Sequence, residues 1–183
     1  MIPFGPTVHT LKVTLCDVEP TVWRRIVVRS EMPLPKLARV LEVAMGWQGY
    51  HLHMFDVGGV LFGDPDEDAD YVINEKHATV KQVLPRLDSR LRWDYDFGDG
   101  WEHEVVVEAI ESPTEGGRYP MCLDGKRACP PEDCGGAGGY MRLLEALSDP
   151  KDPEHDVLAE WAPEGFDPEA FDVIATNRRL RGR

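Results

Sequence analysis

Alternating apolar and polar residues open the chain and predict a β-hairpin followed by a helix. Residues 7–17 and 21–29 each alternate with a period of two, which indicates strands, and Glu19-Pro20 forms the turn between them. In the second strand one face carries Val22, Arg24, Ile26 and Val28. Residues 34–47 then change to helical spacing, with one apolar stripe that ends at Gly46.

Further strands are predicted in the middle of the chain. Residues 51–57 and 60–62 flank the Gly58-Gly59 turn, and residues 91–97 and 101–110 flank Gly98–Gly100. In the last of these segments His103 falls on the same face as Trp101, Val105 and Val107. We therefore expect His103 to be buried beside aromatic side chains.

The amino-acid composition of the chain changes after Glu111. Eight of the 15 prolines lie between Pro113 and Pro168, and residues 119–139 resemble an irregular Pro/Cys/Gly-rich loop. Helical spacing returns in residues 140–147, 153–161 and 168–175. The fold class predicted is α+β: a mostly antiparallel sheet with one helix packed on it, followed by that loop and short C-terminal helices.

Length and charge limit the organisation and the partners. A chain of 183 residues favours one domain, here 1–177, with a sheet-rich part (7–111), a loop and helical part (112–177) and a basic tail (178–183). The net charge is −13, although residues 1–50 carry +2 and the tail holds four arginines. Phosphate contact needs cationic surface, so nucleic acid is an unexpected partner except through the tail. No apolar run predicts a membrane span or a leader, so a cytoplasmic location is expected.

Cysteine and histidine residues provide the first candidate chemistry. Cys122, Cys129 and Cys134 lie on the predicted loop, and with His103 they match the donors of a structural Cys₃His zinc site. The spacing lacks the two-residue gap of zinc knuckles, so free thiols in a loop remain the alternative.

A second arrangement would be catalytic. His51 and His53 are two residues apart on a predicted strand and share a face, so with His103 they could hold a hydrolytic metal ion. Asp99 or Glu102 would then act as the general base.

Interleaved aromatic and charged residues provide a candidate binding surface. These residues are Trp23, Arg25, Tyr95, Asp99 and Trp101. Such a set can contact a protein or peptide partner, or it can consist of core aromatics beside surface charges.

Five ordered motifs resemble one family. They are Val22-Trp-Arg-Arg-Ile26; Ala44-Met-Gly-Trp47 with His51-Leu-His53; Tyr95-Asp-Phe-Gly-Asp99 with Trp101-Glu-His103; Ala128-Cys-Pro-Pro-Glu-Asp-Cys-Gly-Gly136 with Gly139-Tyr140; and Asp167-Pro-Glu-Ala-Phe-Asp172. Together they resemble the Ri-plasmid open-reading-frame-three-like family over residues 7–177. The resemblance implies a compact α+β domain carried on plasmids and insertion elements, some members being labelled resolvase-like, and it supplies no catalytic residues.

These observations favour a non-catalytic binding module of mobile-element type, with zinc as an optional stabilising cofactor. A metal-dependent hydrolase is the alternative. A weaker alternative is a DNA-associated, resolvase-like accessory protein that uses the basic tail. A serine recombinase needs a nucleophilic serine among arginines, and none of Ser30, Ser89, Ser112 and Ser148 lies in such a motif.

Overall fold

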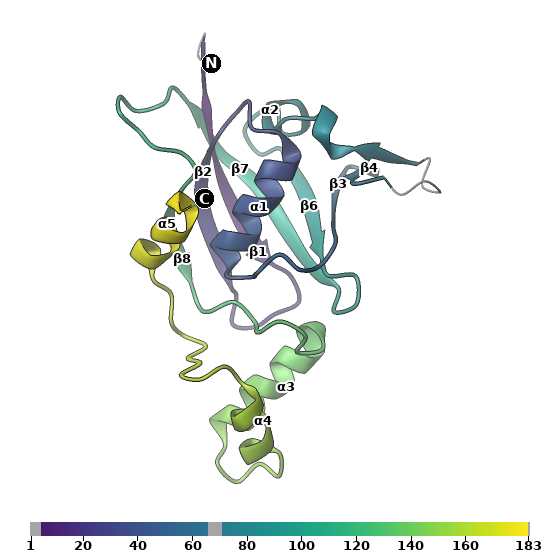
Figure 1. Ribbon diagram of the computed structural model, residues 1–183, viewed down its shortest axis with the longest axis vertical. Helices are drawn as coiled ribbons and strands as arrows, with labels where there is room; N and C mark the ends of the chain where they lie inside the picture. Colours follow the sequence, from purple (N-terminus) through teal and green to yellow (C-terminus); the bar gives the residue numbers. More distant parts are fainter. Residues whose placement is uncertain (1–4, 66–70, 183) are drawn as a thin grey trace.

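One eight-stranded sheet organises the computed structural model, which describes residues 5–65 and 71–182 (Figure 1). The strand order is β5-β4-β3-β6-β7-β1-β2-β8, and every neighbouring pair is antiparallel except β4 and β5. The strands are β1 (Val8–Leu15), β2 (Trp23–Arg29), β3 (His53–Val57), β4 (Val60–Gly63), β5 (Val72–Asn74), β6 (Arg90–Tyr95), β7 (Trp101–Glu111) and β8 (Met121–Lys126). The predicted α+β class and the three predicted hairpins are confirmed.

Helix α1 (Leu34–Met45) covers one face of the sheet (Figure 1). Nine of its 12 residues are buried, and a proline in its first turn favours the start of the helix. Gly46, at φ 125°, ends the helix by donating its N–H to the carbonyl of Glu42. This end of α1 lies beside β2, and the loop that follows it leads to β3.

The remaining helices follow the strands β5 and β8 in the chain. A 3₁₀ turn (Glu75–His77) and α2 (Val80–Val83) follow β5. Helices α3 (Gly136–Ser148) and α4 (His155–Trp161) pack against each other at one end of the sheet, and α5 (Val173–Arg181) lies against β8 and α1 (Figure 1). Within the described residues no helix is both long and apolar enough to cross a membrane.

Two predictions about the second half of the chain were wrong. Part of the expected loop is strand β8, which pairs with β2 through a bulge between Arg25 and Ile26. The last helix begins at Val173 rather than at residue 168, because Asp172 caps it by accepting the N–H groups of Ile174 and Ala175. The expected basic tail therefore lies largely within α5.

Candidate metal centre

Three connections meet at the end of the sheet that carries α3 (Figure 1). They are the loop from α1 to β3, the turn between β6 and β7, and the loop from β8 to α3. The indole Nε1 of Trp47 donates to the carbonyl of Pro130 at 3.2 Å, and the N–H of Gly135 donates to Asp99 Oδ2 at 3.1 Å. A Cβ on Gly136 would lie 2.3 Å from the Asp99 carbonyl, so only glycine permits this close approach.

Each connection contributes to one cluster around the imidazole of His51. Its Nε2 lies 3.6 Å from Asp96 Oδ2, 3.7 Å from Glu132 Oε2 and 3.6 Å from Asp133 Oδ1. Asp96 and Glu132 are largely buried, whereas the side chain of Asp133 is 75% exposed. The cluster is therefore shielded from solvent on the side of Asp96 and Glu132 and open to solvent on the side of Asp133.

Surrounding groups orient these carboxylates and leave one oxygen of each directed at His51. Asp96 Oδ1 accepts the N–H groups of Gly98 and Asp99, which leaves Oδ2 for the cluster. Glu132 Oε1 accepts the N–H of Gln48 at 2.9 Å and the hydroxyl of Tyr95 at 3.3 Å, which leaves Oε2.

The phenol of Tyr95 acts here as a hydrogen-bond donor. Burial and the neighbouring Glu132 charge raise the pKa of Tyr95, so the phenol keeps its proton at neutral pH.

The spacing of the cluster fits a shared cation better than direct hydrogen bonds. His51 Nε2 and Glu132 Oε2 are both buried and have no hydrogen-bond partner among the described residues. Distances of 3.6–3.7 Å are too long for a hydrogen bond. Ligand bonds of about 2.0–2.2 Å around a tetrahedral ion place neighbouring donors about 3.3–3.6 Å apart. The donor atoms of His51, Asp96 and Asp133 all lie within 4.8 Å of one another, and Glu132 lies beside this group. An ion held by these three residues would satisfy His51 Nε2 and would attract Glu132 Oε2.

The predicted Cys₃His zinc site is not assembled. In the described parts of the chain, one group of three or more potential ligands has all its donor atoms within 4.8 Å of one another, and it is His51, Asp96 and Asp133. The sulfur of Cys122 lies in β8 and donates to the carbonyl of Asp124. Burial raises the pKa of Cys134 to about 12 and that of Cys129 well above its usual value, so both are protonated thiols in the metal-free protein.

The expected histidine triad is also separated. His103 is fully buried in the core, as predicted, and His53 pairs with Glu75 at 3.0 Å. Of the two expected general bases, Asp99 accepts a hydrogen bond from Gly135, and Glu102 lies on the exposed face of β7 near Arg92. Only His51 of the three histidines belongs to the cluster.

The expected binding surface divides between two faces of the sheet. Tyr95 and Trp101 are buried and pack against Trp47, at 4.6 and 5.9 Å between ring centroids, so a partner cannot reach them. Trp23 and Arg25 are half-buried on the opposite face, where the guanidinium of Arg25 lies 5.2 Å from the indole. Strand alternation separates the two pairs.

Sequence reasoning missed Asp96, Glu132 and Asp133 as candidate ligands. All three lie in loops, where no periodic spacing connects them, and they are 36 or more positions apart from one loop to the next. The available signal was that Asp96 belongs to the Tyr95–Asp99 motif, and that Glu132 and Asp133 lie between Cys129 and Cys134. Both motifs contribute residues to the cluster, although other residues of these motifs are the ligands that the sequence suggests.

Comparison with known proteins shows which family the sequence matches. A model of the family described as plasmid pRiA4b ORF-3-like protein matches residues 7–175. A protein of Sinorhizobium fredii, described as uncharacterized protein y4hQ, is 41% identical over 157 residues, which cover 85% of this chain and 80% of that protein. The crystal structure of a protein of unknown function, MM3350 from Methanosarcina mazei Go1, is similar with a TM-score of 0.86 and 35% identity, covering 93% of this chain and 97% of that one.

Proposed function

We propose that this protein, which belongs to the plasmid pRiA4b ORF-3-like family, is a binding module stabilised by a divalent cation held by His51, Asp96 and Asp133, with the Glu132 carboxylate beside them. One observation carries the proposal. Two buried polar atoms, His51 Nε2 and Glu132 Oε2, have no hydrogen-bond partner among the described residues, yet they face each other at 3.7 Å beside two further carboxylates. Buried polar groups without partners are rare, and a cation would supply the missing interaction.

The donor set limits the ion. One imidazole nitrogen and several carboxylate oxygens suit Zn²⁺ or Mn²⁺, whereas a thiolate-rich set would select zinc alone among these. The strongly acidic chain also favours cation binding in general. Such an ion would join three connections that are far apart in sequence, so its main effect is on stability.

Metal content and thermal stability test the proposal together. Protein freed of metal by a chelator should regain about one equivalent of Zn²⁺ or Mn²⁺. At about 100 times the dissociation constant the ion should stabilise the fold by about 2.7 kcal/mol, or about 5–10 °C. His51→Ala should lose both effects, and the exposed His77→Ala should retain them. Failure of the wild type to take up either ion, or equal uptake by His51→Ala, would contradict the proposal.

A metal-dependent hydrolase is the second candidate, and the exposure of Asp133 favours it. A catalytic ion keeps one coordination position for water, and the solvent-facing side of the cluster would provide it. Hydrolysis of p-nitrophenyl phosphate or p-nitrophenyl acetate by the metal-loaded protein, abolished in Asp133→Asn, would support catalysis. Hydrolysis no faster than the uncatalysed background, with a full equivalent of metal bound, would contradict catalysis and support a purely stabilising metal ion.

A further inference from the structure

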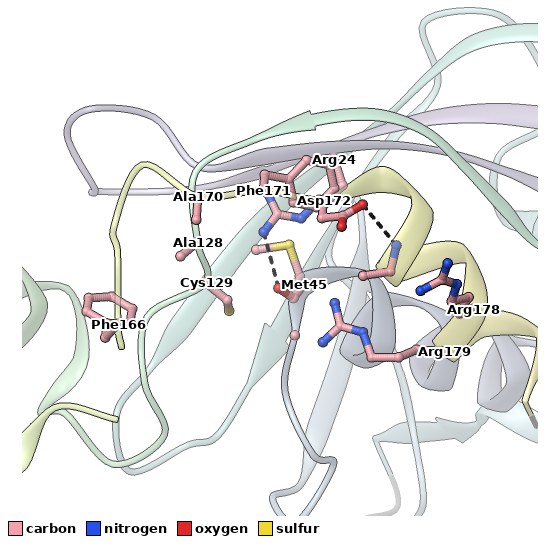
Figure 2. Close-up of a pocket in the computed structure, with 12 residues that line it drawn as sticks. Arg24, Met45, Ala128, Cys129, Phe166, Ala170, Phe171, Asp172, Arg178 and Arg179 are labelled. Atoms are coloured by element: carbon pink, nitrogen blue, oxygen red, sulfur yellow. Dashed lines mark hydrogen bonds between the residues drawn. The ribbon is translucent and has the colours of Figure 1, made fainter. Parts of the chain in front are cut away.

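A cavity of about 810 Å³ lies between the end of α1, the loop after β8 and helix α5 (Figure 2). Its volume falls within the range of about 300–1,000 Å³ that small-molecule sites occupy. Met45, Phe166, Phe171 and small alanine side chains provide apolar walls. Three arginines also line it: Arg24 from β2, and Arg178 and Arg179 from α5 (Figure 2).

Arg24 is a buried cation held by neutral groups. It is 1% exposed and donates to the backbone carbonyls of Trp23, Ala44, Met45 and Lys126. These bonds use four of the five guanidinium N–H groups. The guanidinium also stacks on Phe171 at 4.0 Å from the ring centroid. No carboxylate of the described residues forms an ion pair with it.

The charge of Arg24 persists at neutral pH. Burial and, to a smaller extent, the nearby Arg179 cation lower the pKa of Arg24 to about 10, which remains well above neutrality. Like charges that share one cavity repel each other, and a buried charge is costly unless a counter-charge compensates it. Arg24 and Arg179 therefore both favour an anion between them.

Arg178 and Arg179 add to the positive field of the cavity. Within the described parts of the chain neither forms an ion pair, and Arg179 donates only a 3.3 Å hydrogen bond to Thr176. The acidic residue among the lining side chains is Asp172, whose Oδ1 accepts two N–H groups of α5. These bonds, and then the Arg178 and Arg179 cations, lower the pKa of Asp172, so one carboxylate offsets part of the charge of the three arginines. The lining thus carries a net positive charge in a chain whose overall charge is −13.

We infer that this cavity binds a small organic anion, with a carboxylate or phosphate head directed at Arg24 and Arg179 and an apolar body against Met45 and Phe166. The guanidinium of Arg179 on a flexible side chain can approach the head, while the fixed Arg24 supplies a constant field. This inference uses none of the residues of the cation cluster, so it stands or fails independently of the proposed function.

The same geometry argues against the arginines acting as a free arm on DNA. Leu180 is 6% exposed and Thr176 is fully buried, so α5 is packed against the body of the protein rather than extended. Arg178 and Arg179 are exposed on α5, and both line a cavity that also has apolar walls, which suits a ligand with both characters.

Calorimetric titration of the full chain tests the inference with four probes of similar size. Phenyl phosphate and benzoate carry the two anionic heads, benzyl alcohol is neutral, and benzylammonium is cationic. We expect saturable 1:1 binding of at least one anionic probe, and the comparison of the two shows which head is preferred. Binding of benzyl alcohol as tight as that of both anions, or no saturable binding of either anion, would overturn the inference.

Two matched arginine variants locate the site. Arg179→Gln should weaken the bound anion about tenfold, or about 1.4 kcal/mol, whereas the exposed Arg86→Gln should bind as the wild type does. Because Arg179 makes no ion pair in the described structure, its variant is expected to unfold at nearly the wild-type temperature. Equal affinity in Arg179→Gln and the wild type would refute the assignment of the anion to this cavity.

Discussion

Acidification should destabilise this protein in a way that depends on His103. The imidazole is fully buried against two indoles, with its ring centroid 4.7 Å from that of Trp93 and 5.0 Å from that of Trp47. Its Nδ1–H donates to the carbonyl of Trp93 at 3.0 Å, while Nε2 has no partner among the described residues. A second proton would place a charge in this apolar site with no acceptor and with the Arg24 cation nearby.

The magnitude follows from the difference between the two states. Burial lowers the pKa of His103 to about 3, against 6.5 in an unfolded chain. Between pH 6.5 and pH 3 the unfolded state therefore binds a proton that the folded state does not bind. The contribution of His103 to the free energy of unfolding is fully present above pH 6.5 and declines as the pH falls towards 3. Between about pH 7 and about pH 4.5 the loss from this group is about 2.5 kcal/mol.

Urea unfolding at those two pH values measures this loss, and His103→Asn isolates it. Asparagine keeps an N–H near the position of Nδ1 but does not titrate. The variant should be less stable at both pH values, because it leaves a cavity, yet its pH-dependent loss should be smaller than that of the wild type by about 2.5 kcal/mol. The remaining dependence comes from other groups, including His9, whose pKa burial also lowers. Identical pH dependence in the two proteins would refute the reasoning.

Three further changes probe the packing that positions both sites. Gly136→Ala should destabilise the fold by about 1–3 kcal/mol in urea unfolding, because the φ of +68° and the contact with Asp99 exclude a side chain. The control Gly138→Ala, with no atom within 4 Å of the added Cβ, should be neutral or stabilising by up to about 1 kcal/mol, and equal effects of the two substitutions would contradict the account. Arg24→Lys should lower the free energy of unfolding by about 2–4 kcal/mol, because one ammonium cannot reach four separate carbonyls. A melting temperature within 2 °C (about 1 kcal/mol) of the wild type would be inconsistent with this prediction. Asn177→Ala should increase amide exchange of Cys122, whose N–H and C=O bond the Asn177 side chain, and unchanged protection would show that this contact does not hold the β8 edge.

The sheet was largely predictable because its signal is local. Alternation over residues 7–29 and 91–110 gave the strands, and the same alternation placed His103 in the core. Strand β8 was missed because glycine, cysteine and charged residues interrupt its pattern. It is held instead by pairing with β2 and by the side chain of Asn177, which bonds to both backbone groups of Cys122. Tertiary contacts of this kind leave little trace in local propensity.

The candidate metal ligands depended still more on tertiary structure. Asp96 and Asp133 are held in left-handed backbone conformations at φ 58° and 56° by tight turns, and these turns aim their carboxylates at His51. Nothing in the spacing of 51, 96 and 133 indicates that proximity. The buried Arg24, in contrast, was visible as a charged residue on the apolar face of its strand, and the position of α5 was needed to show that it lines a cavity.

The most direct test of the cation site is an anomalous difference map from crystals of the full chain soaked in Zn²⁺ or Mn²⁺. The account predicts one strong peak within about 2.0–2.2 Å of His51 Nε2 and of oxygens of Asp96 and Asp133. A map with no peak there, or with its strongest peak at Cys129 and Cys134, would contradict the central claim.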